Sequence, residues 1–258
     1  MNNERNIMAK KLEIKELNIE HLSEVMNLQA KVIGDLGKDE KHFVLQRSAQ
    51  DFIKALEHEH TYMLGVFDGD KLIAQSIFAY PQNGQERDMP EFAGDLSNDD
   101  LVIYKAILVD RDHRGSGLMK TMLDYIEAKS AEYGKKTSII QIAIDNPASW
   151  ISAMANGMAI CKVDNDPYDG AKVLYLKKNL YCENSPKVEG KRFSMFVGHN
   201  IHKEILPLFN KMRYWASKGY HGVRMDKNSH SLIWVKQEEQ TRNLWQIKAG
   251  VPDKTIRY

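Results

Sequence analysis

Residues 101–144 constrain the fold more than any other part of the chain. Residues 101–109 are almost continuously apolar, as in a central strand that is covered on both faces. Residues 116–133 follow with apolar side chains at helical spacing up to Gly134, and residues 138–144 form a second apolar run. A helix of this length between two buried strands makes a βαβ unit, which requires parallel strands and a right-handed crossover.

The flanking segments predict a larger sheet around this unit. A β-hairpin is expected at Asp68-Gly69-Asp70, because glycine can take the positive φ that a tight turn needs. The predicted fold is therefore α/β, with a mixed and mainly antiparallel central sheet, a parallel βαβ core and flanking helices. Further strands are expected at residues 11–15, 61–67, 71–80, 159–163, 171–179, 192–197 and 231–236, and further helices at 21–36, from 48, from 146 to about 157, and at 201–218.

Composition excludes several classes of protein. The 258 residues are 43% hydrophobic and 28% charged, which is typical of a globular chain. The sequence has no apolar run long enough for a membrane span, and its N-terminus has no apolar signal segment, so we expect a cytoplasmic protein without membrane contact. Cys161 and Cys182 lack the spacing of a zinc site, and we predict no metal.

Charge divides the chain at about Pro186. Residues 1–186 contain 22 Lys and Arg against 29 Asp and Glu, a net charge of −7, whereas residues 187–258 contain 14 against 6, a net charge of +8. The basic residues are scattered singly among apolar ones, which favours a folded C-terminal α+β extension docked on an acidic body over a nucleic-acid partner. We expect a flexible leader at 1–10, one domain at 11–180 and the basic extension at 187–258.

The turn between the first buried strand and the long helix is rich in glycine. Residues 114–118 read Arg-Gly-Ser-Gly-Leu, so the N–H groups that open the helix are not covered by side chains. Such a helix start binds anions, most often phosphate. Arg114 and Met119 occupy the positions that a Walker motif gives to glycine, and GxGxxG lacks its third glycine. A turn with only a structural role is the alternative.

The order of these motifs resembles the GCN5-related N-acetyltransferase (GNAT) family. Val-Asp-x-x-x-Arg-Gly-x-Gly-Leu, a long helix, a strand, Asn-Pro, a short helix and Asn-Gly-Met follow one another after the first buried strand. The likeness in element order covers residues 11–180 and implies the acyl-CoA N-acyltransferase fold. The family loop, Gln/Arg-x-x-Gly-x-Gly/Ala, is matched from Arg114 to Leu118, and Met119 replaces its last small residue.

The resemblance also implies a co-substrate, acetyl-CoA, and residues that bind it. Backbone groups of three strand residues would pair with the pantetheine arm, and the N–H of Leu108 or Val109 would polarise the thioester carbonyl. Asn146 matches a CoA-contacting residue, and it also suits the N-cap of the next helix. The implied cofactor-binding residues are Ile107, Leu108, Val109, Arg114, Gly115, Ser116, Gly117, Leu118, Met119 and Asn146.

Catalytic side chains depart from the family pattern. Ala153 stands where many relatives have a general-acid tyrosine, and Gln141 stands where a carboxylate base is common. Lys105 is a cation in an apolar strand, and we interpret it either as an acceptor-site residue or as a lysine that reaches solvent. Tyr168, in the turn before the last family strand, is the candidate replacement acid, with a packing role as the alternative.

These features predict an N-acetyltransferase that moves an acetyl group from acetyl-CoA to a primary amine by direct attack in a ternary complex. The acceptor would be a small molecule, an amino acid or a peptide. One alternative is a catalytically weak acyl-CoA-binding regulatory module, and another is a modifier of a macromolecule held by the basic extension. The expected partners are acetyl-CoA and the amine, without a membrane or nucleic acid, and a homodimer is left open.

Overall fold

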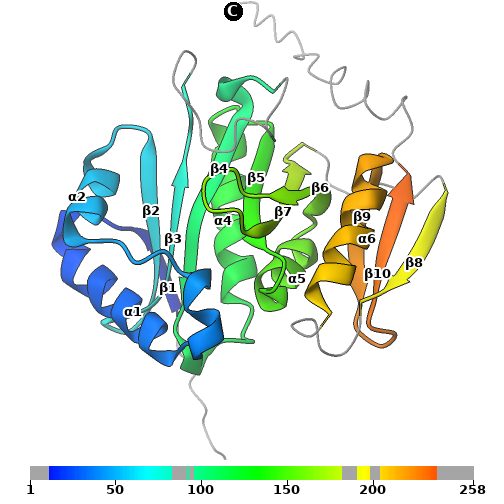
Figure 1. Ribbon diagram of the computed structural model, residues 1–258. Coiled ribbons are helices and arrows are strands. Elements are labelled where there is room, and N and C mark those ends of the chain that lie inside the picture. Colours follow the sequence, from blue (N-terminus) through cyan, green and yellow to red (C-terminus); the bar gives the residue numbers. More distant parts are fainter. Residues whose placement is uncertain (1–11, 83–91, 93–95, 182–190, 198–203, 237–258) are drawn as a thin grey trace, which may run out of the picture.

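The computed structural model describes residues 12–82, 92, 96–181, 191–197 and 204–236, and Figure 1 shows how their elements are arranged. The strands are β1 (Leu12–Glu16), β2 (Thr61–Asp68), β3 (Lys71–Ala79), β4 (Leu101–Val109), β5 (Thr137–Ala143), β6 (Ala159–Asn165), β7 (Lys172–Asn179), β8 (Arg192–Phe196), β9 (Tyr220–Asp226) and β10 (Ser231–Lys236). The α-helices are α1 (Leu22–Asp35), α2 (Ala49–Glu57), α4 (Leu118–Glu132), α5 (Pro147–Ala155) and α6 (Ile205–Ser217), and short 3-10 turns include η2 (Lys38–Phe43) and η4 (Arg111–His113).

The strands of the described segments form one sheet in the order β1-β2-β3-β4-β5-β7-β6-β9-β10-β8. β4 and β5 are parallel, and α4 connects them. Each of the other neighbouring pairs in this sheet is antiparallel. The predicted mixed sheet with a parallel βαβ core is therefore confirmed.

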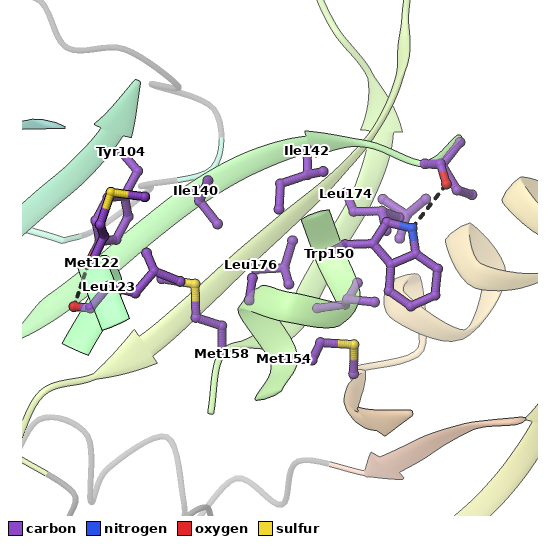
Figure 2. Close-up of a cluster of buried hydrophobic side chains, with 14 of the residues drawn as sticks. Tyr104, Met122, Leu123, Ile140, Ile142, Trp150, Met154, Met158, Leu174 and Leu176 are labelled. Atoms are coloured by element: carbon purple, nitrogen blue, oxygen red, sulfur yellow. Dashed lines mark hydrogen bonds between the residues drawn. The ribbon is translucent and has the colours of Figure 1, made fainter. Parts of the chain in front are cut away.

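Helices cover both faces of the sheet (Figure 1). On one face, α1 and α2 bury Val25, Leu28 and Phe52 against sheet residues that include Ile77 and Leu108. On the opposite face, α4 and α5 lie against β4, β5 and β7. Figure 2 shows part of this second cluster, formed by Tyr104, Met122, Leu123, Ile140, Ile142, Trp150, Met154, Met158, Leu174 and Leu176.

A buried polar network fixes the middle of α4 to its neighbours. The Glu127 carboxylate accepts a hydrogen bond from Ser138 Oγ of β5 at 2.9 Å and forms an ion pair with Lys178 of β7. Asn156, just after α5, donates a further hydrogen bond to the same carboxylate. Burial raises the pKa of Glu127, and its three partners act in the opposite direction. These bonds hold α4 in one position, and its N-terminus with it.

The C-terminal segment continues the sheet. β9 joins β6 at the pair Ile160 and Gly222, and β10 and β8 follow beyond it. The expected strand at 192–197 and the expected strand at 231–236 are present as β8 and β10. The sequence interpretation missed β9, whose residues do not alternate clearly between apolar and polar. The expected leader at 1–10 and the start of the expected helix at 201–218 lie outside the described residues.

None of the described helices combines the length and the apolar character that crossing a membrane requires.

Candidate active site

The two parallel strands diverge halfway along their length. Their ladder runs from Leu101 opposite Thr137 to Tyr104 opposite Ile140, although β4 continues to Val109 and β5 to Ala143. On its other side, β4 contains a β-bulge. Ile77 of β3 lies opposite Ala106 and Phe78 lies opposite Tyr104, so Lys105 is the extra residue of the bulged strand. A bulge bends its strand, which explains why β4 turns away from β5 at this point.

A cavity of about 740 Å³ occupies the region where β4 and β5 separate. Its lining comes from the connection between α1 and α2, from α2, from the diverging strand segments, from the start of α4 and α5, and from the β6–β7 turn. The cavity therefore passes from the face covered by α1 and α2 to the edge where α4 begins. The residues of β4 and β5 in its lining are Ile103, Tyr104, Lys105, Ala106, Ile107, Ile140, Gln141, Ile142 and Ala143.

A glycine loop leads from β4 into α4. Gly115 and Gly117 have φ of +77° and +83°, which residues with a Cβ rarely adopt. Gly117 is the N-cap of α4, and an added Cβ on either glycine would meet open space. The first N–H groups of α4 have no intrahelical acceptor, because a helix begins with four such donors. The loop therefore presents a concave group of backbone donors with the positive end of the helix dipole behind it.

A buried carboxylate anchors the base of this loop. The Asp110 side chain is fully buried and receives hydrogen bonds from Lys31 of α1 and from Lys71 of β3, the latter at 2.9 Å. Burial acts to raise the pKa of Asp110, but the two ammonium groups outweigh it and hold the pKa well below its usual range. The same contacts, with Asp112, raise the pKa of Lys31 to about 12. α1, β3 and the loop are thus joined through one charge cluster.

Comparison of the sequence with protein families identifies the domain. The model of the acetyltransferase (GNAT) family matches residues 30–151, which include the diverging strands, the glycine loop and α4. The chain contains a GNAT-family acetyltransferase domain. No curated protein sequence matches the chain.

Solved GNAT-type structures are similar in fold. The ribosomal-protein-S18-alanine N-acetyltransferase of Escherichia coli has a TM-score of 0.50 and 14% identity, over 68% of this chain and 98% of that one. A probable acetyltransferase of Staphylococcus epidermidis has a TM-score of 0.51 and 15% identity, over 66% of this chain and 99% of that one. The GNAT domain of S. lividans PAT has a TM-score of 0.50 and 18% identity, over 65% of this chain and 90% of that one. At these identities the likeness concerns the fold alone.

The cofactor-binding residues that the family pattern implies lie along β4, around the start of α4 and, for Asn146, at the start of α5. Side chains of Ile107 and Met119 line the cavity, whereas Leu108 is buried against the α1 and α2 face. Asn146 lines the cavity and also caps α5, because its Oδ1 accepts the N–H of Ser149 at 3.2 Å. The position of Asn146 is therefore compatible with both roles suggested by the sequence, contact with CoA and capping of the helix. The remaining implied residues, Val109, Arg114, Gly115, Ser116, Gly117 and Leu118, form the end of β4, the loop and the first residue of α4.

The candidate catalytic residues Lys105 and Tyr168 both line the cavity. Lys105 is exposed at the bulge, and Tyr168 is 84% exposed in the β6–β7 turn. Ala153 of α5 is fully buried in the core, so this position supplies no proton to the cavity. The cavity is thus lined by Lys105 and Tyr168, whereas the position of the usual catalytic tyrosine is occupied by the buried Ala153.

Charged side chains from the α1–α2 connection face the same cavity. Arg47 of this connection, Lys54 of α2 and Lys105 of β4 line it, so cations from three parts of the chain contribute to its wall. His42 of η2 also lines it, and its Nε2 lies 2.8 Å from an oxygen of Asp145 at the end of β5. This contact joins the α1–α2 connection to the β5–α5 turn across the opening between the strands.

Sequence reasoning did not identify the half-buried carboxylate of the cavity as a site residue. Asp166 of the β6–β7 turn is half-buried, lines the cavity and accepts a hydrogen bond from Gln141 Nε2 of β5. Gln141 stands where the family pattern favours a carboxylate residue. In this protein its side-chain amide donates a hydrogen bond to the carboxylate of Asp166. The two residues are 25 positions apart, so only their long-range contact could have revealed the pair.

Cys161 is a partly buried free thiol on β6. Its Sγ lies 3.7 Å from Nδ1 of His221 on β9, although no histidine is near it in the sequence. Burial raises the pKa of Cys161 to about 11, so the thiol is not activated as a nucleophile at neutral pH.

Proposed function

We propose that this protein is an N-acetyltransferase that transfers the acetyl group of acetyl-CoA to a primary amine by direct attack in a ternary complex. The observation that carries the proposal is the cavity between the diverging β4 and β5. It is bounded at one end by the start of α4 and at the other by charged groups from the α1–α2 connection. One end suits a phosphate-bearing co-substrate and the other suits a polar acceptor.

The residues of the glycine loop fit the diphosphate of acetyl-CoA. Gly115 and Gly117 leave the loop surface open, and the first N–H groups of α4 are available as donors from Gly117 to Met119. Backbone groups of Ile107, Leu108 and Val109 lie past the end of the β4–β5 ladder, where β5 no longer pairs with them in the described structure. These residues pair with β3 on their other side, and their backbone groups that face away from β3 are available to bind the amide groups of the pantetheine arm, as an added strand would.

Acetyl-CoA supplies an activated acyl group, so the protein has to position the amine and stabilise developing charge. A backbone N–H of Leu108 or Val109 would donate to the thioester oxygen as negative charge develops there. Tyr168 at the cavity rim is the proposed proton donor to the leaving sulfur. Lys105, Arg47 and Lys54 attract a carboxylate on the acceptor, which favours amino acids or peptides.

The protein in the Escherichia coli structure is named as an acetyltransferase of a ribosomal-protein alanine, and that name agrees with a peptide-like acceptor. The predicted cytoplasmic location and the absence of a nucleic-acid partner stay predictions.

A catalytically weak acyl-CoA-binding module is the second candidate. It is favoured by the buried Ala153 and by Gln141 at two positions where the family pattern has catalytic side chains.

A panel of amines separates the two candidates. Amino acids, dipeptides and polyamines are incubated with acetyl-CoA, and free CoA is followed with a thiol reagent. Amine-dependent release, fastest with carboxylate-bearing amines, supports the transferase. Absence of release with every amine, together with a rise in melting temperature on adding acetyl-CoA, contradicts it and supports the binding module.

A further inference from the structure

The point where β4 and β5 separate is marked by two polar side chains. Tyr104 and Ile140 are the last paired residues, so Lys105 and Gln141 are the first residues of each strand beyond the ladder. Ile140 and Ile142 belong to the cluster that α4 and α5 cover, as Figure 2 shows. Because side chains alternate along a strand, Gln141 points to the opposite face, which is the acceptor side of the cavity.

Gln141 and the β6–β7 turn fix the orientation of Asp166. Asp166 Oδ2 accepts the hydrogen bond from Gln141 Nε2. Asp166 Oδ1 accepts the backbone N–H of Tyr168 at 2.8 Å and that of Asp169 at 3.4 Å. The carboxylate is thus held by three N–H groups, one from the strand and two from its own turn.

The Asp166 carboxylate accepts hydrogen bonds from neutral groups in the described structure. All three donors are neutral amides, and no lysine or arginine in the described ranges forms an ion pair with Asp166. An ionised carboxylate offers about four lone-pair sites, so three donors leave room for one more. A half-buried negative charge in a cavity attracts a cation, and an ammonium group has the matching size and donors.

We infer that Asp166 is the residue that binds the ammonium group of the acceptor, and that Gln141 is its positioning residue. The inference rests on the proposed function and specifies its acceptor. Because Gln141 stands at the first position beyond the ladder, Asp166 holds the nitrogen close to where the thioester would lie. With Lys105 on the neighbouring strand, the site then favours an acceptor that carries both an ammonium and a carboxylate group.

The chemistry of the transfer balances with this assignment. The N–C bond forms as the C–S bond breaks, and the electron pair of the C–S bond leaves with sulfur. The nitrogen loses two protons. One goes to solvent, and the other restores the hydroxyl of Tyr168 after Tyr168 has protonated the departing thiolate, which becomes the thiol of CoA. Asp166 is a carboxylate at the start and at the end, and its part is to bind and orient the amine.

Substitution of Asp166 by asparagine tests the inference. Asparagine keeps the acceptor oxygen for the turn but removes the charge. We expect the KM of alanylglycine to rise at least about tenfold, because a hydrogen bond between charged groups is lost. The KM of acetyl-CoA and the melting temperature should change little. Gln141→Met should raise the KM of alanylglycine by a smaller factor, and Asp164→Asn, outside the cavity, should leave it unchanged.

A binding measurement separates the role of charge from a purely structural role. Calorimetric titration of the full chain in the presence of CoA compares alanylglycine with propionylglycine, which lacks only the ammonium group. Asp166→Asn should weaken binding of alanylglycine and leave propionylglycine unaffected. Equal weakening of both ligands, or unchanged binding of alanylglycine, overturns the inference.

The two proposals fail in different ways. If the wild-type protein releases no CoA with any amine of the panel, the proposed function is wrong, and the titration still decides whether Asp166 binds ammonium. If the wild-type protein acetylates alanylglycine and Asp166→Asn does so with the same KM, the proposed function stands and the assignment of Asp166 is wrong. If neither the wild-type protein nor the variant binds alanylglycine, the inference is overturned as well.

Discussion

Single residues determine where the cavity opens. Lys105 is the extra residue of the β-bulge in β4, and the β4–β5 ladder ends at the residue before it. Deleting one residue here would restore a regular ladder with β3 and reverse the faces of the residues that follow. The position of the bulge therefore controls both the width of the opening and the side chains that line it.

Lys105 should influence the choice of acceptor. Lys105→Met keeps the length of the side chain and removes its charge, so the KM of carboxylate-bearing amines should rise. Because Lys105 is exposed, water screens its charge, and we expect a change of about fivefold rather than a complete loss. Steady-state kinetics with alanylglycine and with spermidine measures the difference. If the variant has the same KM values for both amines as the wild-type protein, Lys105 does not contact the acceptor and belongs to the solvent-exposed surface.

The glycine loop should bind phosphate through its backbone. Ser116 lies between the two positive-φ glycines and does not share their conformation, so it accepts a larger side chain without backbone strain. Ser116→Asp places a negative charge beside the proposed diphosphate site and should abolish the rise in melting temperature that acetyl-CoA produces. Ser116→Asn, of the same size but uncharged, is the matched control and should retain most of that rise. An Asp variant that is stabilised as strongly as the wild-type protein would exclude this loop as the binding site.

Whole elements are positioned by buried polar groups as well as by apolar packing. α4 is fixed at its middle by Glu127, with Ser138 and Lys178, and the loop before it is fixed by Asp110. Each carboxylate is contacted by elements that are distant in the sequence. These contacts hold the N-terminus of α4 toward the cavity, where the proposed diphosphate site lies.

Replacing Asp110 should destabilise the fold at neutral pH. Asp110→Asn leaves Lys31 and Lys71 without their shared carboxylate, and we expect a loss of about 2 kcal/mol in the free energy of unfolding. The pKa of Asp110 is lowered in the folded state, so its contribution is present above the carboxyl pKa of the unfolded chain, about 3.9. That contribution disappears as the pH falls below this value toward the lower pKa of the folded state.

Urea unfolding at pH 7 and at pH 3 measures this effect. The difference between Asp110→Asn and the wild-type protein should be large at pH 7 and smaller at pH 3. Asp112→Asn is the control, because Asp112 also contacts Lys31 but its side chain is 71% exposed, and it should change stability by less than about 0.5 kcal/mol. A difference that stays constant between the two pH values would mean that the charge of Asp110 does not stabilise the fold.

At the scale of the whole molecule, the C-terminal segment shares the core of the GNAT-type domain. Trp234 of β10 and Met212 of α6 are fully buried in the same apolar cluster as Trp150 of α5. Arg213 of α6 pairs with Asp164 of β6 at 2.7 Å, so one of the basic residues of the extension meets an acid of the body. This arrangement agrees with a docked extension, and the boundaries of the domains stay predictions.

Removing the extension should expose apolar surface. A chain of residues 1–186 loses α6, β8, β9 and β10, which leaves β6 as a sheet edge and uncovers part of the core around Trp150. We expect a lower melting temperature and association in solution, measured by calorimetry and light scattering. A monodisperse truncated protein with unchanged stability would show that the extension is an independent module.

A point substitution tests the same junction in the full chain. A Cβ added at Gly222 would lie 3.3 Å from Ile160 of β6 and from Leu232 of β10, so the glycine permits close packing there. Gly222→Val should therefore destabilise the protein, in the same direction as the truncation.

The sequence alone determined the βαβ unit, the glycine loop and the capped helix at Asn146. Each depends on patterns within a few residues, namely apolar periodicity, glycine at positive φ and N-cap side chains, and such patterns act before distant segments meet. The family resemblance added the fold and the positions at which catalytic groups are usual. It also showed that Ala153 and Gln141 depart from that pattern.

The tertiary structure decided which side chains share the cavity. The bulge at Lys105 depends on the register between β3 and β4, and the contact between Gln141 and Asp166 depends on two strands and a turn that meet only in the folded sheet. The buried charge of Asp110 and the pairing of β9 with β6 are likewise long-range. No local pattern specifies these contacts, because their free energy comes from burying and pairing groups that are distant in the chain.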